Sequence, residues 1–201
     1  MIVKLFINPL NYSLDRLYTK EENEYLIGVD KGAYHALKHG IELDLAIGDF
    51  DSTDETETAY IKKHAKVVKT HKARKDETDS YLAIKEALRL NPEEIIVYGG
   101  IGSRLDHTYA NIALLKQGTI VFMNDKNKMY MLSPGQYDIK NTQTYISFFA
   151  IEDVVKLSLT GFSYAITDYD LAVDDPLCVS NKGSGTVSFD EGLLLVMESS
   201  D

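Results

Sequence analysis

Over about the first 120 residues, short apolar runs alternate with segments whose apolar residues recur at helical spacing. The apolar runs predict buried strands at residues 2–7, 24–30, 44–48, 66–69, 94–98 and 119–123. The segments between them predict helices at residues 33–39, 52–64, 78–90 and 104–117. This alternation predicts a mostly parallel sheet with helices on both faces and right-handed connections.

Residues that favour helix ends support these boundaries. Ser52 and Glu55 have the spacing of a capping box, so a helix is expected to begin there. Gly40 is expected to end the first helix, and Asn91 with Pro92 to end the third.

The pattern changes near residues 124–128, beyond which helical periodicity is poor. Short apolar segments separated by turn residues predict strands at residues 128–132, 144–150, 154–159, 178–181, 186–189 and 193–198. Such a series predicts an antiparallel β-sandwich. We therefore expect two domains, an α/β domain at residues 1–125 and a β-sandwich at residues 126–201.

Composition narrows the classes of protein that fit. The formal net charge is -10 and the isoelectric point is about 4.9, which argues against a nonspecific nucleic-acid binder because such a surface repels phosphates. The sequence has no run of about 18 apolar residues, so no membrane span is expected. The one cysteine, Cys178, allows no internal disulfide, and its apolar neighbours predict burial. These features favour a cytoplasmic protein.

Carboxylates recur where the predicted strands end. Because the carboxyl ends of parallel strands share one edge of a sheet, where ligands bind, these side chains are expected to converge. The acids are Asp30, Asp49, Asp51, Asp76, Asp79 and Asp106. Acids gathered on one rim repel one another unless cations neutralise them, and Mg²⁺ is the usual cation beside phosphate substrates.

The pair Asp49 and Asp51 has two interpretations. In an extended backbone, residues two apart face the same side, so both carboxylates could hold one metal ion or two. Alternatively, Asp51 or Ser52 caps the following helix.

Residues 75–79 open the third predicted helix and also have two interpretations. Asp76 or Thr78 could simply cap the helix. The segment just before it is basic, and interleaved cations and carboxylates suit a magnesium–polyphosphate complex. The basic residues are Lys69, His71, Lys72, Arg74 and Lys75.

A glycine-rich turn at residues 99–103 lies between a predicted strand and a predicted helix. Gly100 and Gly102 allow the backbone close to a phosphate, and the helix amino terminus attracts anions. Arg104 adds a guanidinium that can grip phosphate oxygens. The turn matches neither a Walker A loop nor a complete dinucleotide-binding fingerprint. His107 could be a general base, a ligand or a structural hydrogen-bonding residue.

These motifs, in this order, resemble those of the thiamin pyrophosphokinase family. The matching stretches are GVDKGA (28–33), DLAIGDFDS (44–52), KDETD (75–79), GGIGSRLDH (99–107) with Asn111, LTGFSY (159–164) and VSN (179–181). The resemblance implies a catalytic, nucleotide-binding α/β domain followed by a thiamin-binding β-sandwich. It also implies a homodimer, with thiamin between the α/β domain of one subunit and the sandwich of the other.

The resemblance further implies roles for individual residues. The metal-binding and diphosphate-binding acids would be Asp49, Asp51, Asp76 and Asp79. Residues near ATP or the reacting groups would be Asp30, Lys75, Gly100, Gly102, Arg104, Asp106, His107 and Asn111. Ser180 and Asn181 would lie on the thiamin side. The chain has no tryptophan, so Phe162, Tyr164 or Tyr169 would stack on the vitamin, or another residue would line the pocket.

The implied reaction is attack of the thiamin hydroxyl on the β-phosphorus of ATP, with AMP leaving. Such a transfer needs positioning and charge neutralisation, with Asp51, Asp79, Arg104 and Asp106 as the catalytic residues. Two alternatives remain. The sequence from Asp49 to Thr53 resembles the DxDxT signature of haloacid-dehalogenase-type phosphatases, although no downstream lysine and paired-acid motif follows. The other alternative is a non-catalytic nucleotide-binding module.

Overall fold

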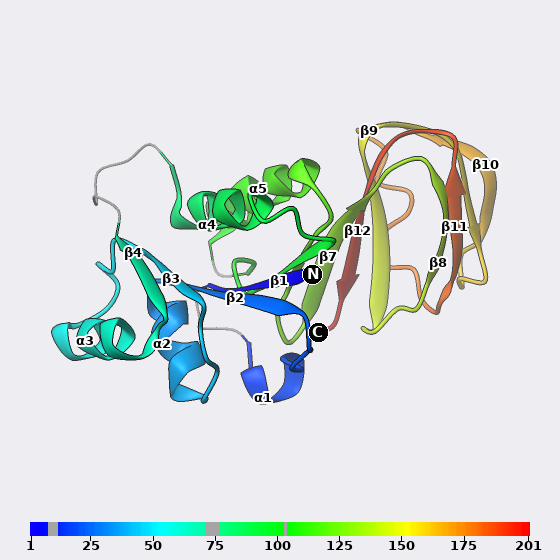
Figure 1. Cartoon of the computed structure of the whole chain (residues 1–201). Helices are drawn as coiled ribbons and strands as arrows, with labels where there is room; N and C mark the ends of the chain where they lie inside the picture. Colours follow the sequence, from blue (N-terminus) through cyan, green and yellow to red (C-terminus); the bar gives the residue numbers. More distant parts are fainter. Residues whose placement is uncertain (8–11, 71–76, 103) are drawn as a thin grey trace. The chain divides into compact units, whose positions relative to one another are not determined.

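The structure is a computed structural model that describes residues 1–7, 12–70, 77–102 and 104–201. The chain divides into two compact units, Met1–Asp125 and Lys126–Asp201 (Figure 1). Within the described residues, no helix is both long and apolar enough to cross a membrane.

Among the residues that the structure describes, six strands form the sheet of the first unit. Its strands are β1 (Ile2–Phe6), β2 (Glu24–Val29), β3 (Leu45–Gly48), β4 (Val67–Thr70), β5 (Glu94–Tyr98) and β6 (Ile120–Met123). They lie in the order β4-β3-β2-β1-β5-β6, and each of these neighbours pairs in parallel. The prediction of a mostly parallel sheet is therefore confirmed for this unit.

Helices cover both faces of this sheet. They are α1 (Leu14–Leu17), α2 (Lys31–Lys38), α3 (Glu55–His64), α4 (Asp79–Leu88), α5 (Leu105–Leu114) and the short 3₁₀ helix η2 (Leu115–Gln117). Figure 1 shows α4 and α5 on one face and α1, α2 and α3 on the other. Residues of the central strands such as Leu5, Ile27 and Val97 have no exposed surface, because helices cover both faces there, whereas the edge strand β4 is mostly exposed.

Two glycines set the position of α2 against the sheet. A Cβ atom on Gly28 would lie 2.5 Å from the Cα atom of Ala33, and one on Gly32 would lie 2.2 Å from the carbonyl oxygen of Phe6. Any larger residue would push the helix away from β1 and β2. The amino terminus of α2 is thereby fixed at the carboxyl edge of the sheet.

The structure shows which residues cap α3 and α4. The predicted capping box of Ser52 and Glu55 is wrong: α3 begins at Glu55, and its capping box is formed by Asp54 and Glu57. Thr78 caps α4, because its side chain accepts a hydrogen bond from the backbone N–H of Tyr81. The short helix α1 was not predicted.

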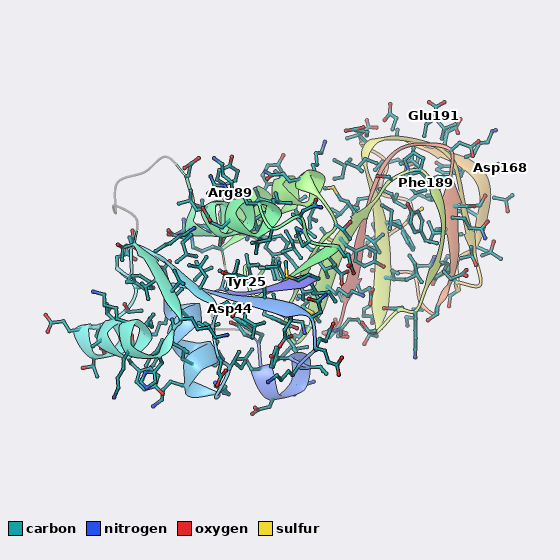
Figure 2. All side chains as sticks on the ribbon, viewed as in Figure 1. Tyr25, Asp44, Arg89, Asp168, Phe189 and Glu191 are labelled. Carbon is teal, nitrogen blue, oxygen red and sulfur yellow. The ribbon has the colours of Figure 1, made fainter. Side chains whose placement is uncertain are left out.

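All pairs of neighbouring strands in the second unit are antiparallel. They are β7 (Asn127–Leu132), β8 (Gly135–Ile139), β9 (Tyr145–Thr160), β10 (Ile166–Leu171), β11 (Gly185–Phe189) and β12 (Glu191–Ser199). The first part of β9 pairs with β12, and its second part pairs with β10 and β11. Figure 2 shows Phe189 pointing between the strands, with Asp168 and Glu191 at the outer edge. Phe189 belongs to a buried apolar cluster.

Several strand predictions in this unit are wrong. The two strands expected at residues 144–150 and 154–159 are one 16-residue strand, β9, whose middle residues Glu152 and Asp153 are exposed and therefore look like a turn in the sequence. The strand expected at residues 178–181 is reduced to a single bridge between Asn181 and Ile146. Strands β8 and β10 were missed because polar, exposed residues dominate them. Cys178 is buried, as predicted.

Candidate active site

Three carboxylates converge at the carboxyl edge of the parallel sheet. Asp30 follows β2, Asp49 follows β3 and Asp79 is the first residue of α4. Each offers an oxygen atom, and these oxygens all lie within 4.8 Å of one another. Separate chain segments therefore bring three of the six predicted acids to one place. Oxygen ligands at this spacing suit a hard divalent cation.

Asp30 is the most perturbed acid of this trio. Its backbone has a positive φ of 47°, and its Oδ1 accepts a hydrogen bond of 3.0 Å from the backbone N–H of Phe50. Burial raises the pKa of Asp30 to about 7, and the nearby charges of Asp79, Asp49 and Asp51 add to the rise, while the Phe50 N–H opposes it. In this environment the negative charge of a carboxylate is unfavourable unless a proton or a cation neutralises it.

The segment from Asp49 to Asp51 is not extended, so the extended backbone expected for this pair is wrong. Phe50 between them has a φ of 60° and is buried in the core, which turns the chain. The backbone N–H of Asp51 donates to Asp49 Oδ1 at 3.1 Å. Asp51 itself is exposed and lies outside the trio. Gly48 is required because a Cβ there would lie 1.8 Å from Asp30 Oδ1.

A cavity of about 410 Å³ opens beside the trio. Its walls come from the carboxyl ends of β1, β2 and β5 and from the amino-terminal turns of α2, α4 and α5. Lining residues that bear on chemistry are Asp30, Lys31, Asp79, Gly100, Arg104 and His107. The cavity thus combines carboxylates, two cationic side chains and glycine backbone, which is the combination that a magnesium–polyphosphate complex needs.

The glycine-rich turn is held by side-chain amides. Asn111 is buried, and its Nδ2 donates to the carbonyl oxygen of Gly100 at 2.6 Å. Asn124 donates to the carbonyl oxygen of Ile101 at 3.2 Å. Gly100 has a φ of 73°, and a Cβ there would lie 2.6 Å from Ile7 Cδ1. Asn111, predicted as a nucleotide-side residue, therefore lines the cavity and also holds this turn in shape.

Arg104 and Asp106 form an exposed pair rather than joining the trio. Arg104 Nε donates to Asp106 Oδ1 at 3.1 Å, and a second bond joins Arg104 Nη2 to Oδ2. The Arg104 guanidinium lowers the pKa of Asp106 to about 2. A carboxylate with such a low pKa is a weak base, so this geometry does not favour Asp106 as the group that takes a proton.

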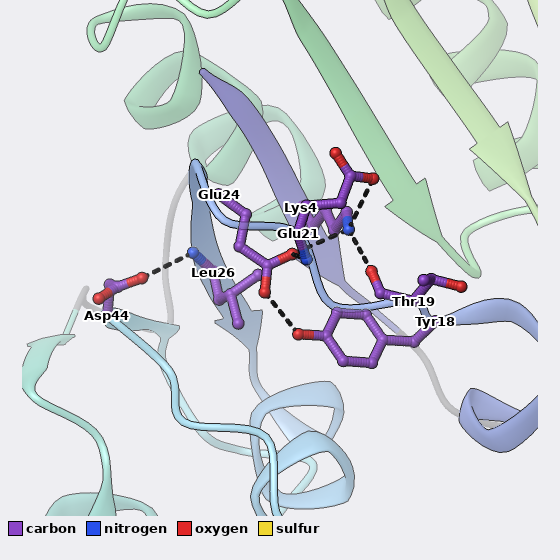
Figure 3. A network of polar contacts seen from close by, with 7 residues as sticks. All are labelled: Lys4, Tyr18, Thr19, Glu21, Glu24, Leu26 and Asp44. Carbon is purple, nitrogen blue, oxygen red and sulfur yellow. Dashed lines mark hydrogen bonds and ion pairs between the residues drawn. The ribbon is translucent and has the colours of Figure 1, made fainter.

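A second cavity, of about 440 Å³, lies at the opposite, amino edge of the same sheet. There Lys4, only 1% exposed, donates to Glu24 Oε2 at 2.8 Å and to the carbonyl oxygen of Thr19 at 2.6 Å (Figure 3). The hydroxyl of Tyr18 donates to Glu24 Oε1 at 2.6 Å. Nearby, Lys66 pairs with Asp44 at 2.8 Å. These acids face lysines within the protein, which is typical of a structural network.

Comparisons with known proteins show the family to which this chain belongs. The family models for "Thiamin pyrophosphokinase, catalytic domain" and "Thiamin pyrophosphokinase, vitamin B1 binding domain" match residues 17–130 and 136–194. A thiamine pyrophosphokinase of Bacillus subtilis (strain 168) is 38% identical and covers 96% of this chain and 95% of its own. This chain belongs to the thiamin pyrophosphokinase family.

Solved structures of the family have the same fold. The Bacillus subtilis thiamine pyrophosphokinase matches with a TM-score of 0.89 and 36% identity, over 100% of this chain and 99% of that chain. The thiamin pyrophosphokinase of Geobacillus thermodenitrificans matches with a TM-score of 0.86 and 30% identity, over 100% and 98%.

In the unit that contains the vitamin B1 binding match, the predicted residue Asn181 is buried. Its Oδ1 accepts from the backbone N–H of Tyr164 at 2.9 Å, and its Nδ2 donates to the Tyr164 carbonyl oxygen at 2.8 Å. Ser180 beside it has a φ of 58°, and its N–H donates to Ser147 Oγ. The Asn181 side chain thus holds the backbone of Tyr164, whose own side chain is 67% exposed.

The three aromatic residues predicted to stack on the vitamin differ in how much of the ring is exposed. Of the three aromatic candidates, Phe162 is buried against Phe148 and Tyr169 bonds to Asp175, so Tyr164 is the one that presents its ring to the surface. Lys75 and Asp76 lie outside the described residues. Lys31 was missed by the sequence analysis, although it directly follows Asp30 in the motif GVDKGA.

Proposed function

We propose that this chain transfers the β,γ-diphosphate of ATP to the hydroxyl of thiamin, giving thiamin diphosphate and AMP. The observation that carries the proposal is the convergence of Asp30, Asp49 and Asp79 beside the glycine-rich turn, inside the region that matches the family's catalytic domain. ATP and thiamin are the substrates that membership of the family implies.

Mg²⁺ fits the donor set at the sheet edge. The trio offers oxygen atoms only, and the raised pKa of Asp30 reflects burial first and then the neighbouring negative charges, which a dication would neutralise. Asp30, Asp49 and Asp79 would hold the ion, with Asp51 and Asp76 as further proposed ligands. When bound, Mg²⁺ supplies charge neutralisation for the polyphosphate.

The chain's own residues position the reactants. The backbone around Gly100 and Gly102 accommodates phosphate oxygens, and His107 lines the same cavity. Arg104, kept in place by Asp106, would offset charge on the leaving AMP. In this scheme Asp106 orients Arg104 and does not act as the base.

On the thiamin side, we propose that Tyr164 stacks on the vitamin and that Asn181 positions Tyr164. An exposed aromatic face suits a thiazolium cation. We further propose a homodimer, because each unit exposes large apolar side chains: Leu105 and Tyr109 on α5 are 80% and 78% exposed, and Leu177 in the second unit is 55% exposed.

One incubation tests the proposal. The protein is mixed with thiamin, ATP and Mg²⁺, and the products are separated. Equal amounts of AMP and thiamin diphosphate, formed only when thiamin and Mg²⁺ are both present, are expected. Release of ADP or inorganic phosphate would point to another phosphoryl transfer, and nucleotide binding without turnover would point to a non-catalytic module.

A further inference from the structure

Lys31 is a charged residue of the active-site cavity for which packing gives no reason. It is the first residue of α2 and lines the cavity beside Asp30. Gly28 and Gly32 fix the backbone around it by close packing, yet the Lys31 side chain is 49% exposed. The fold therefore requires the position of this backbone but not a lysine on it.

The charge of Lys31 is also unusual for its place in a helix. The positive end of a helix dipole disfavours a cation in the first turn. The other long helices of this unit carry acids there: Glu55 in α3, Asp79 in α4 and Asp106 in α5. A lysine at the start of α2 adds to the positive potential of that helix end, which benefits an anion in the cavity.

The contact that Lys31 makes is weak and exchangeable. Its Nζ lies 3.6 Å from Glu57 Oε1, beyond hydrogen-bond distance. The other oxygen of Glu57 accepts from the backbone N–H of Asp54 in the capping box of α3. Glu57 is thus fixed by its own helix, while Lys31 can leave it without breaking a hydrogen bond.

We propose that Lys31 binds an oxygen of the ATP polyphosphate, exchanging its pairing with Glu57 for the phosphate. This inference rests on the proposed function, because it assigns Lys31 to the nucleotide of that reaction. Lys31 contributes to binding of the substrate before the transfer, so its loss raises KM for ATP and leaves kcat and KM for thiamin little changed.

The binding test uses titration calorimetry with Mg²⁺ and the α,β-methylene analogue of ATP, which does not react. Lys31→Ala is expected to weaken Kd by about tenfold or more, and Lys31→Arg to restore most of it. Lys85→Ala is the matched control: Lys85 is 48% exposed and lies 3.6 Å from Glu77 Oε1, but it does not line the cavity. Equal Kd values for Lys31→Ala and the wild type would overturn the proposal.

Glu57→Gln tests the exchange itself. Glutamine still closes a capping box, so the helix start is preserved while the competing charge is removed. We expect Glu57→Gln to tighten binding of the analogue about two- to fivefold in the wild type and to have no such effect in Lys31→Ala. The same effect in both backgrounds would contradict exchange. Because the analogue does not react, weaker binding by Lys31→Ala would support the role of Lys31 even if the wild type made no thiamin diphosphate, and that result would reject only the proposed reaction.

Discussion

Both edges of the parallel sheet carry acidic side chains, but the surroundings of these acids are opposite. At the amino edge, Glu24 accepts hydrogen bonds from Lys4 and Tyr18, and Asp44 pairs with Lys66. At the carboxyl edge, the oxygens of Asp30, Asp49 and Asp79 face one another. The cavities at the two edges have similar volumes, about 440 and 410 Å³, so cavity size does not distinguish the two edges.

The pKa values of acids at the two edges are shifted in opposite directions. Burial raises the pKa of Glu24, but hydrogen bonds from Lys4, Tyr18 and the Glu21 N–H outweigh it, so the value is lowered overall. Burial and neighbouring acids raise the pKa of Asp30 to about 7. A structural network neutralises its charges within the chain, whereas a binding site leaves that to its ligand.

The largest effect is expected from the carboxyl edge. Asp49→Asn and Asp79→Asn should each lower kcat for thiamin diphosphate formation at least about a hundredfold, because each removes charge that holds the polyphosphate complex. Thermal unfolding should be unchanged or shifted upward, since repulsion within the trio falls. The exposed Asp174→Asn serves as the control and should keep full activity. Full activity in both Asp49→Asn and Asp79→Asn would contradict the claim that the carboxyl edge binds the polyphosphate complex.

The next effect is on stability, at the amino edge. Lys4→Met should lower the free energy of unfolding by about 3–5 kcal/mol, because it leaves the buried Glu24 carboxylate without its lysine. Adding Glu24→Gln should restore part of the loss. Chemical denaturation measures both, and turnover per folded molecule should stay at the wild-type level. A loss below about 1 kcal/mol would mean that Lys4 is not part of a structural network.

In the metal-free protein, the contributions of the two edges to the free energy of unfolding should change with pH in opposite directions. Asp30 ionises at about 7 when folded but near its ordinary 3.8 when unfolded, so its ionisation costs stability that accumulates from about pH 4 to pH 7. Asp30→Asn should therefore be more stable than the wild type at pH 8, with the difference vanishing toward pH 4. Glu24, with a lowered pKa, stabilises above its ordinary 4.5 and loses this as pH falls. Glu24→Gln should be less stable at neutral pH, with a gap that narrows in acid. Unfolding free energies of the wild type and both variants, measured in chelator across this pH range, check the prediction. Curves of unfolding free energy against pH that run parallel for all three proteins would contradict it.

The smallest effect is expected from the exposed pair at the amino edge. Lys66 is 61% exposed, so solvent screens its interaction with Asp44. Lys66→Ala should leave the midpoint of thermal unfolding and the turnover unchanged. A clear drop in either would mean that the amino edge depends on this pair as well as on the buried Lys4.

Much of the α/β unit could be predicted because local patterns and long-range packing agree there. The start of α3 could not: Ser52 with Glu55 and Asp54 with Glu57 have the same capping-box spacing. The second is used because burial of Phe50 turns the preceding segment, and the Thr53 N–H bonds to the Phe50 carbonyl oxygen. The sequence does not reveal that choice, since it depends on packing.

The sequence predicted the three acids of the trio, but it predicted neither their geometry nor Lys31 in the cavity. The positions of Asp30, Asp49 and Asp79 after strands or at a helix start follow from the sequence pattern. The raised pKa of Asp30 depends on burial by distant segments. Lys4 interrupts an apolar run and would be expected at the surface, yet it is buried because Glu24 lies on the neighbouring strand.

The most direct test of the account is Mn²⁺ binding, measured by electron paramagnetic resonance as a substitute for Mg²⁺. With ATP present, the wild type and Asp174→Asn should bind Mn²⁺ equally well, and Asp30→Asn, Asp49→Asn and Asp79→Asn should each bind it at least about tenfold more weakly. Wild-type affinity in all three trio variants would contradict the claim that these carboxylates hold the cation.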